Sequence, residues 1–169
     1  VEGKKVDNNL EPDLIDRLEF ISKNFVAKLE RNLPVIVKLS NDTNINQVND
    51  LIRILTDLRF SGVNFGNTST RYQELEKFIN LKEKHHYFYF YNTYGGGVSG
   101  EPLKQTSLEL SKVAIESINT ISPQKEFHII RTGGISTADD LEQSISAGIK
   151  INQWYTGYFK NFGINGQNR

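Results

Sequence analysis

Two glycine-containing segments near the C-terminal end constrain the fold most strongly, because each directly follows a short apolar run. Residues 129–136 read Ile-Ile-Arg-Thr-Gly-Gly-Ile-Ser, and residues 154–157 read Trp-Tyr-Thr-Gly. Glycine lets backbone N–H groups approach an anion closely, and the N-terminus of a following helix adds positive charge. In β/α barrels, the loops after strands seven and eight usually form such sites. The two segments therefore predict neighbouring strand ends that hold a phosphate-bearing cofactor.

The rest of the chain alternates between apolar β-prone runs and amphipathic helical patterns, which indicates a parallel sheet with helical crossovers. With 169 residues, the chain is too short for a complete eight-stranded barrel, which needs about 250. We therefore expect an α/β fold, the C-terminal half of a TIM (β/α)8 barrel with about four β/α units. The expected strands are 33–39, 62–66, 127–131 and 149–155, and the expected helices are 13–31, 45–58, 106–119 and 136–148.

These elements divide the chain into three parts. Residues 1–33 are expected to form an N-terminal arm and an amphipathic helix, 34–157 the half-barrel, and 158–169 an irregular tail. Within the half-barrel, 71–94 reads as a long insertion over the barrel mouth, with a short helix and one irregular strand at the aromatic run 87–91. Half a barrel has two open parallel edges, so the chain should need a missing half, a second copy or a large partner.

Helix starts are predicted from side chains that can cap a first turn. Asp42 or Thr43 can cap the helix of 45–58. Capping boxes are expected at Thr106 with Glu109, and at Ser136 with the acidic residue three positions later, Asp139.

Composition excludes several classes of function. Lysine plus arginine and aspartate plus glutamate number 20 each, so no basic surface points to nucleic acid. There is no cysteine, which rules out disulfides, thiolate metal sites and a cysteine nucleophile. The pair His85-His86 is read as part of a solvated loop, because adjacent side chains point apart, and no metal site is expected. The chain opens on Val1 and has no methionine, so we expect a processed protein or a fragment.

Five motifs in order resemble dihydroorotate dehydrogenase, closest to the membrane-associated, quinone-using class. They are Val35-Ile36-Val37-Lys38-Leu39, Asn67-Thr68-Ser69, Gly96-Gly97-Val98-Ser99-Gly100-Glu101-Pro102-Leu103, Thr132-Gly133-Gly134-Ile135-Ser136 and Tyr155-Thr156-Gly157.

The resemblance implies FMN as the cofactor and dihydroorotate or orotate as the ligand. Lys38 corresponds to the lysine that reaches the flavin ring, where a cation stabilises the reduced form. Asn67 and Thr68 correspond to the pair that hydrogen-bonds the planar pyrimidine substrate. The implied FMN-binding residues are Lys38, Gly66, Gly100, Gly133, Gly134, Tyr155, Thr156 and Gly157.

Departures from the family pattern shape the functional expectation. The catalytic base, a serine in this class, belongs to a loop after the fourth strand, so no catalytic residue is assigned here and the chain alone is predicted to be inactive. Asn41 stands where a proline is usual, and Gly66 where a hydroxyl residue is common. The helix that closes the barrel after strand eight is read as missing or disordered. A quinone partner and a mitochondrial or membrane-associated location are implied by the resemblance alone.

Other interpretations stay open at the level of the sequence. Lys38 could extend from a strand end into solvent, and Asn67-Thr68 could form a simple turn. The chain could also be a degenerate, non-catalytic subunit that serves as a structural part of a larger, possibly mitochondrial complex. A third option is a different flavin- or phosphate-binding barrel that acts on another planar substrate.

Overall fold

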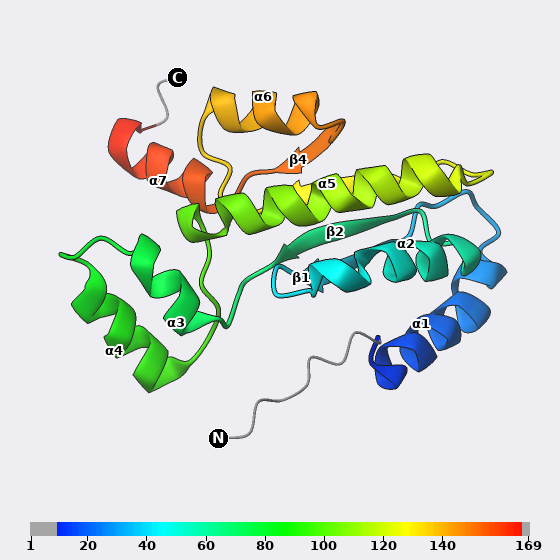
Figure 1. Ribbon diagram of the computed structural model, residues 1–169, viewed down its shortest axis with the longest axis horizontal. Helices are drawn as coiled ribbons and strands as arrows, with labels where there is room; N and C mark the ends of the chain where they lie inside the picture. Colours follow the sequence, from blue (N-terminus) through cyan, green and yellow to red (C-terminus); the bar gives the residue numbers. More distant parts are fainter. Residues whose placement is uncertain (1–9, 167–169) are drawn as a thin grey trace.

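The structure is a computed structural model that describes residues 10–166. It confirms the predicted α/β half-barrel, because four parallel strands lie in the order β1-β2-β3-β4 and alternate with helices (Figure 1). The parts of the predicted arm and tail at 1–9 and 167–169 lie outside the described residues. The strands are β1 (Ile36–Ser40), β2 (Gly62–Asn67), β3 (His128–Thr132) and β4 (Ile151–Gln153); the helices are α1 (Pro12–Asn24), α2 (Val48–Asp57), α3 (Tyr72–Leu75), α4 (Lys84–Tyr94), α5 (Lys104–Ile121), α6 (Ala138–Ser146) and α7 (Thr156–Asn165).

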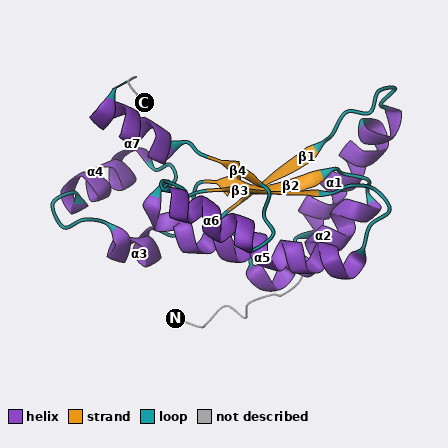
Figure 2. Cartoon of the chain, turned by 90° about the horizontal axis from the view of Figure 1, so that it is seen from above, coloured by secondary structure: helices purple, strands orange, loops and turns teal. Residues whose placement is uncertain are grey.

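The hydrophobic core lies between one face of the sheet and the helices that cover it. In Figure 2, α2, α5 and α6 lie on the same side of the strands. Val63 and Phe65 of β2 are fully buried against Leu55 of α2 and Leu110 of α5. Side chains alternate along a strand, so the residues between them face the other side, which would be the inside of a barrel. This inner face carries the polar groups of the site.

The first strand differs from the expectation of a buried strand over 33–39. It begins at Ile36, which is 37% exposed, and none of its five residues is fully buried. The reason is its place at the edge of the sheet, where it pairs with β2 alone. Its apolar residues Val37 and Leu39 pack on the core, while Lys38 lies on the inner face.

The irregular strand expected at 87–91 is wrong, because these residues lie in the middle of helix α4. The helical spacing of Tyr87 and Tyr91 brings both rings to Tyr72 of α3. The Tyr91 ring stacks on Tyr72 at 4.3 Å between centroids, and the Tyr87 hydroxyl donates to the Tyr72 backbone oxygen at 2.8 Å. These contacts outweigh the local β propensity of the aromatic run.

The irregular tail expected at 158–169 is also wrong, since Thr156–Asn165 forms helix α7. A helix therefore follows the last strand, contrary to the expectation that it is missing or disordered. Aromatic side chains four residues apart pair along it: the ring of Tyr158 stacks on Phe162 at 6.3 Å, and Tyr155 meets Phe159 edge-on at 5.0 Å. Such pairs support a helix despite Gly163.

The helix starts were predicted in the right places but with the wrong capping groups. Before α2, Asn44 caps the short 3-10 turn Ile45–Gln47, in place of Asp42 or Thr43. Helix α5 begins at Lys104, before Thr106, because the 3-10 turn that contains Pro102 starts it earlier. At α6, the capping box is shifted by one residue to Thr137 and Asp140.

Helix α1 ends at Asn24, and a 3-10 turn follows at Val26–Lys28, where a continuous helix to residue 31 was expected. Within residues 10–166, no helix combines the length and the apolar character that crossing a bilayer demands.

Candidate functional site

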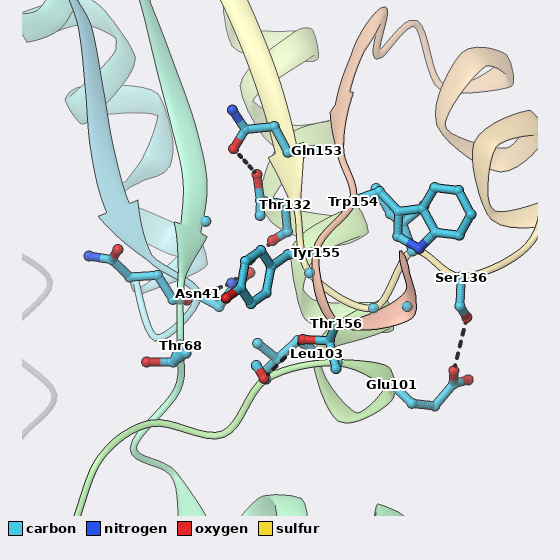
Figure 3. Close-up of a pocket in the computed structure, with 18 of the residues that line it drawn as sticks. Asn41, Thr68, Glu101, Leu103, Thr132, Ser136, Gln153, Trp154, Tyr155 and Thr156 are labelled. Atoms are coloured by element: carbon cyan, nitrogen blue, oxygen red, sulfur yellow. Dashed lines mark hydrogen bonds between the residues drawn. The ribbon is translucent and has the colours of Figure 1, made fainter. Parts of the chain in front are cut away.

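The carboxyl ends of the four strands open into one cavity of about 700 Å³. Its walls come from segments far apart in sequence: the ends of β1 and β2, the loop before α5, and the tips after β3 and β4 (Figure 3). Every residue that the sequence assigned to a cofactor or a substrate lines this cavity, namely Lys38, Gly66, Asn67, Thr68, Gly100, Gly133, Gly134, Tyr155, Thr156 and Gly157.

The tips after β3 and β4 pack against each other at one end of the cavity. Gly133 and Gly134 have φ angles of 128° and 71°, in the region that favours glycine. A methyl group added at Gly157 would lie 2.6 Å from the Ile135 backbone oxygen and 2.9 Å from the Ser136 Cβ. The two glycine segments are therefore neighbours in space, and no side chain fits between them.

Helix α7 begins at the wall of the cavity. Its first turn is closed by the bond from the Phe159 N–H to the Tyr155 oxygen at 3.1 Å. The N–H groups of Thr156 and Gly157 precede this ladder and have no acceptor within the helix. Lys160, one turn further on, also lines the cavity. Unpaired amides, the helix dipole and an ammonium together favour an anion at this end.

The loop before α5 connects both ends of the cavity. Val98 and Ser69 exchange two backbone hydrogen bonds of 3.0 and 2.8 Å, which fastens the loop to the segment after β2. On the other side, the Thr156 hydroxyl donates to the Ser99 hydroxyl at 3.1 Å. Gly100, with a φ of 79°, turns the chain directly after these two attachments.

The buried carboxylate of Asp140 fixes the conformation of the loop after β3. Asp140, 1% exposed, accepts hydrogen bonds of 2.9 Å from the backbone N–H groups of Ser136 and Thr137, and its other oxygen lies 3.1 Å from the Lys104 ammonium. Burial alone would raise the pKa of Asp140, but these bonds outweigh it and lower the pKa from 3.8 to about 2. The bond with Glu101 raises the pKa of Lys104, as does Asp140, although burial opposes them.

Beneath the same loop lies a fully buried arginine. The Arg131 guanidinium donates to Ser144 at 2.7 Å, and to Ser107 and the Lys104 backbone oxygen at 3.1 Å each. Ser107 in turn donates to the Gly133 backbone oxygen at 2.7 Å. Burial lowers the pKa of Arg131, and the nearby Asp140 carboxylate counteracts this, so the guanidinium stays charged. The loop after β3 is thus held by hydrogen bonds at Gly133 and at Ser136 and Thr137, independently of any ligand.

The other end of the cavity is formed by β1 and β2. Lys38 is exposed on the inner face, in register with Asn64 of β2. Asn67 and Thr68 follow β2 and line the wall. Buried Asn41 joins these strand ends through its side-chain amide. An ammonium and several neutral donors and acceptors thus face the anion-binding end across the cavity.

Some cavity residues were not assigned from the sequence. Lys160 was missed because residues 158–169 were read as irregular; its spacing of four from Thr156 would have indicated it once a helix was assumed. Thr132 and Gln153 were missed because their roles depend on strand register. No cluster of three or more histidine or acidic side chains suited to a metal occurs in the described part of the chain, which includes His85 and His86.

The fold and the cavity define a class: a β/α half-barrel with a cavity at the carboxyl ends of its strands, where glycine-rich tips of the last two strands meet. The sequence model of the family described as dihydroorotate dehydrogenase matches residues 5–166, and the chain belongs to this family.

Known relatives support this assignment. Dihydroorotate dehydrogenase (quinone) of Christiangramia forsetii is 33% identical over 86% of this chain and 37% of its own length. The enzyme of the same name from Crocosphaera subtropica is 30% identical over 74% of the chain and 31% of its length. A ligand-free structure from Eimeria tenella superimposes with a TM-score of 0.65 at 23% identity, over 89% of this chain and 42% of that one, and shows the same fold. The chain thus spans about a third of the curated relatives that it matches.

Proposed function

We propose that this chain is the FMN-binding C-terminal half of a dihydroorotate dehydrogenase, which oxidises dihydroorotate to orotate in pyrimidine biosynthesis. The observation that carries the proposal is the convergence of all assigned residues on one cavity. Its anion-binding tips follow β3 and β4, while Lys38 lies on β1 at the opposite edge of the sheet. That separation suits a ligand with a phosphate at one end and a ring at the other.

The residues at each end fit the chemistry of FMN. The unpaired N–H groups of Thr156 and Gly157, with Lys160 nearby, are suited to the phosphate. The Lys38 ammonium is suited to the ring, where it would stabilise negative charge. When bound, FMN supplies the hydride acceptor of the reaction.

The substrate and its partners are assigned on the same basis. Asn67 and Thr68 offer an amide and a hydroxyl, which can orient a planar pyrimidine through both donors and acceptors. The general base comes from the other half of the barrel, because this chain belongs to the region after the fourth strand. Relatives carry the name dihydroorotate dehydrogenase (quinone), so we propose a quinone as electron acceptor. From the family resemblance alone we also propose a membrane-associated or mitochondrial setting.

The phosphate end can be tested with the chain itself. FMN and riboflavin share a ring and differ in the phosphate, so titration with each, followed by flavin fluorescence, isolates this end. We expect FMN to bind at least about tenfold more tightly. Lys160→Gln should reduce this preference, whereas Lys150→Gln, at an exposed position outside the cavity, should preserve it. Equal affinity for the two flavins would count against the proposal.

The catalytic assignment requires the other half of the barrel. Co-expression with a segment that supplies the first four strands should give a coloured complex that oxidises dihydroorotate. Lys38→Ala should abolish most of this activity while the complex still assembles. A complex that assembles and never takes up FMN would contradict the proposal.

A second candidate function is a structural, non-catalytic subunit. It is favoured by α4, in which no residue is buried and Phe88, Tyr89, Phe90 and Tyr94 are exposed. Such aromatic groups are enriched at protein interfaces. Size-exclusion chromatography of material from the native source separates the two ideas: co-migration with a large complex that lacks flavin would favour the structural role.

A further inference from the structure

Each of the four strands contributes a polar side chain to the inner face, at two levels of the sheet. These side chains are Lys38 on β1, Asn64 on β2, Thr132 on β3 and Gln153 on β4. Lys38 is in register with Asn64, and Thr132 is in register with Gln153, two residues further toward the carboxyl ends of the strands. Thr132 directly precedes Gly133 of the anion-binding tips, and Lys38 stands at the other edge. The polar row therefore spans the distance between the two ends of the cavity.

Three members of the row form one hydrogen-bonded cluster, in which the single Thr132 proton can serve only one of its two contacts at a time. The Asn64 amide donates to Gln153 Oε1 at 2.8 Å, and the Thr132 hydroxyl lies 2.8 Å from Asn64 Oδ1 and 2.9 Å from Gln153 Oε1. Figure 3 shows Thr132 and Gln153 side by side on neighbouring strands, joined by a dashed line. Asn64 is 5% exposed, so the network is anchored in the wall and only its outer members reach the cavity.

Proton counting shows what the network leaves for a ligand. Both side-chain carbonyl oxygens already accept, so Gln153 Nε2 is left to donate elsewhere. The single Thr132 proton is used within the network, which leaves a lone pair of its oxygen as an acceptor. The surface thus offers a donor beside an acceptor, which matches hydroxyl groups, since these do both. It is a poor match for an apolar ring, because contact would desolvate these groups without compensation.

The space around the network is also restricted. A methyl group at Gly66 would lie 2.5 Å from Asn64 Oδ1 and 2.9 Å from the Thr132 Cβ. Glycine at position 66 therefore lets the Asn64 and Thr132 side chains occupy the wall between β2 and β3. Because Gly66 has no side chain, the hydroxyl group that lines the cavity between β2 and β3 is that of Thr132.

We infer that Thr132 and Gln153, held in place by Asn64, bind the hydroxylated chain that links the phosphate of the cofactor to its ring. This inference rests on the proposed function, because it takes FMN as the ligand and its ribityl chain as the bound segment. Thr132 and Gln153 act as specificity-determining residues, and Asn64 is a positioning residue.

The test compares FMN with a flavin that carries the same ring and a 5-phosphopentyl chain without hydroxyl groups. The unmodified chain should bind FMN about fivefold to tenfold more tightly than this analogue. Thr132→Val removes the hydroxyl without changing the size of the side chain and should bring the ratio to within about twofold of unity. Thr132→Ser should restore the preference, and Thr120→Val, on the exposed side of α5, should leave it unchanged.

The possible outcomes separate this inference from the proposed function. Failure of the unmodified chain to bind either phosphorylated flavin would refute both. Binding of FMN and the analogue with equal affinity, or a Thr132→Val variant that keeps the full preference, would refute the inference alone. Because the readout is a ratio measured on one folded protein, a general loss of stability in a variant does not imitate the expected result.

Discussion

The side-chain amide of Asn41 donates a hydrogen bond to the backbone oxygen of Asn67 at 2.7 Å, and so ties the end of β1 to the end of β2. The same nitrogen lies 3.3 Å from the backbone oxygen of Thr132 on the third strand. One buried side chain thus joins three strand ends around the cavity. Among the described residues, no donor lies within hydrogen-bond distance of Asn41 Oδ1. The stabilisation by the two amide hydrogen bonds is therefore partly offset by an unpaired buried acceptor.

Replacement of Asn41 by alanine should lower the free energy of unfolding by about 1–2 kcal/mol, because the side-chain bonds to two backbone oxygens are lost, although Asn67 keeps the bond from the backbone N–H of residue 41 and one unpaired oxygen is removed. Urea denaturation measures the change. Asn24→Ala is the matched control, since its amide also donates to a backbone oxygen, but on an exposed helix, and the loss there should stay below about 0.5 kcal/mol. Equal losses for both variants would contradict the linking role of Asn41.

Asp140 should make the free energy of unfolding depend on pH in the range between about 2 and 3.8. Its pKa falls from 3.8 to about 2 on folding, so its contribution is fully present above pH 3.8 and disappears as the pH drops through about 2. Asp140→Asn should cost roughly 2 kcal/mol at neutral pH and little at pH 2. Denaturation at several pH values measures the difference. Asp139→Asn, at the exposed neighbour in the same turn, is the matched control and should cost less than about 0.5 kcal/mol at neutral pH.

Gly157→Ala should weaken FMN binding by more than about tenfold, because the added methyl group would push the two tips apart. The change places a helix-favouring residue in α7, so any loss cannot come from reduced helix propensity. Gly163→Ala in the same helix meets no atom within 4 Å and should leave the affinity unchanged. Titration with FMN measures both, and similar affinities for the two variants would argue against the tips as the phosphate site.

Tyr91→Ala should weaken the packing of α4 against α3, since it removes the ring that stacks on Tyr72. An aromatic pair contributes about 0.5–1.5 kcal/mol beyond its burial, which is large for two short helices. Hydrogen exchange of residues 84–94 should become faster, whereas exchange in β2 and β3 should stay the same. Phe90→Ala, at an exposed position of the same helix, should have little effect.

The sequence predicts the parts of this protein whose patterns are local. The glycine tips, β2, β3 and the helices packed on them follow from apolar periodicity and from glycines at strand ends, and their order implied the parallel sheet. The two glycine segments could be assigned to the cavity because strand ends in such a sheet meet at one edge, whereas the other cavity residues were named from the resemblance of the five motifs to dihydroorotate dehydrogenase.

The remaining features depend on contacts that no local pattern reveals. The run Tyr87–Tyr91 favours a strand by propensity, and its contacts with Tyr72 of α3 favour the helix instead. Lys160 could be assigned to the cavity only once residues 156–165 were known to form helix α7. The bonds of Thr132 to Asn64 and Gln153 require the register of three strands, and the burial of Arg131 requires the helices that supply its acceptors.

The position of β1 and β4 at the two margins of the sheet has a practical consequence for handling the protein. Each has main-chain groups along one side that can join a strand from any other molecule, so self-association should rise steeply with concentration. Dilute preparations should therefore favour soluble material over precipitate.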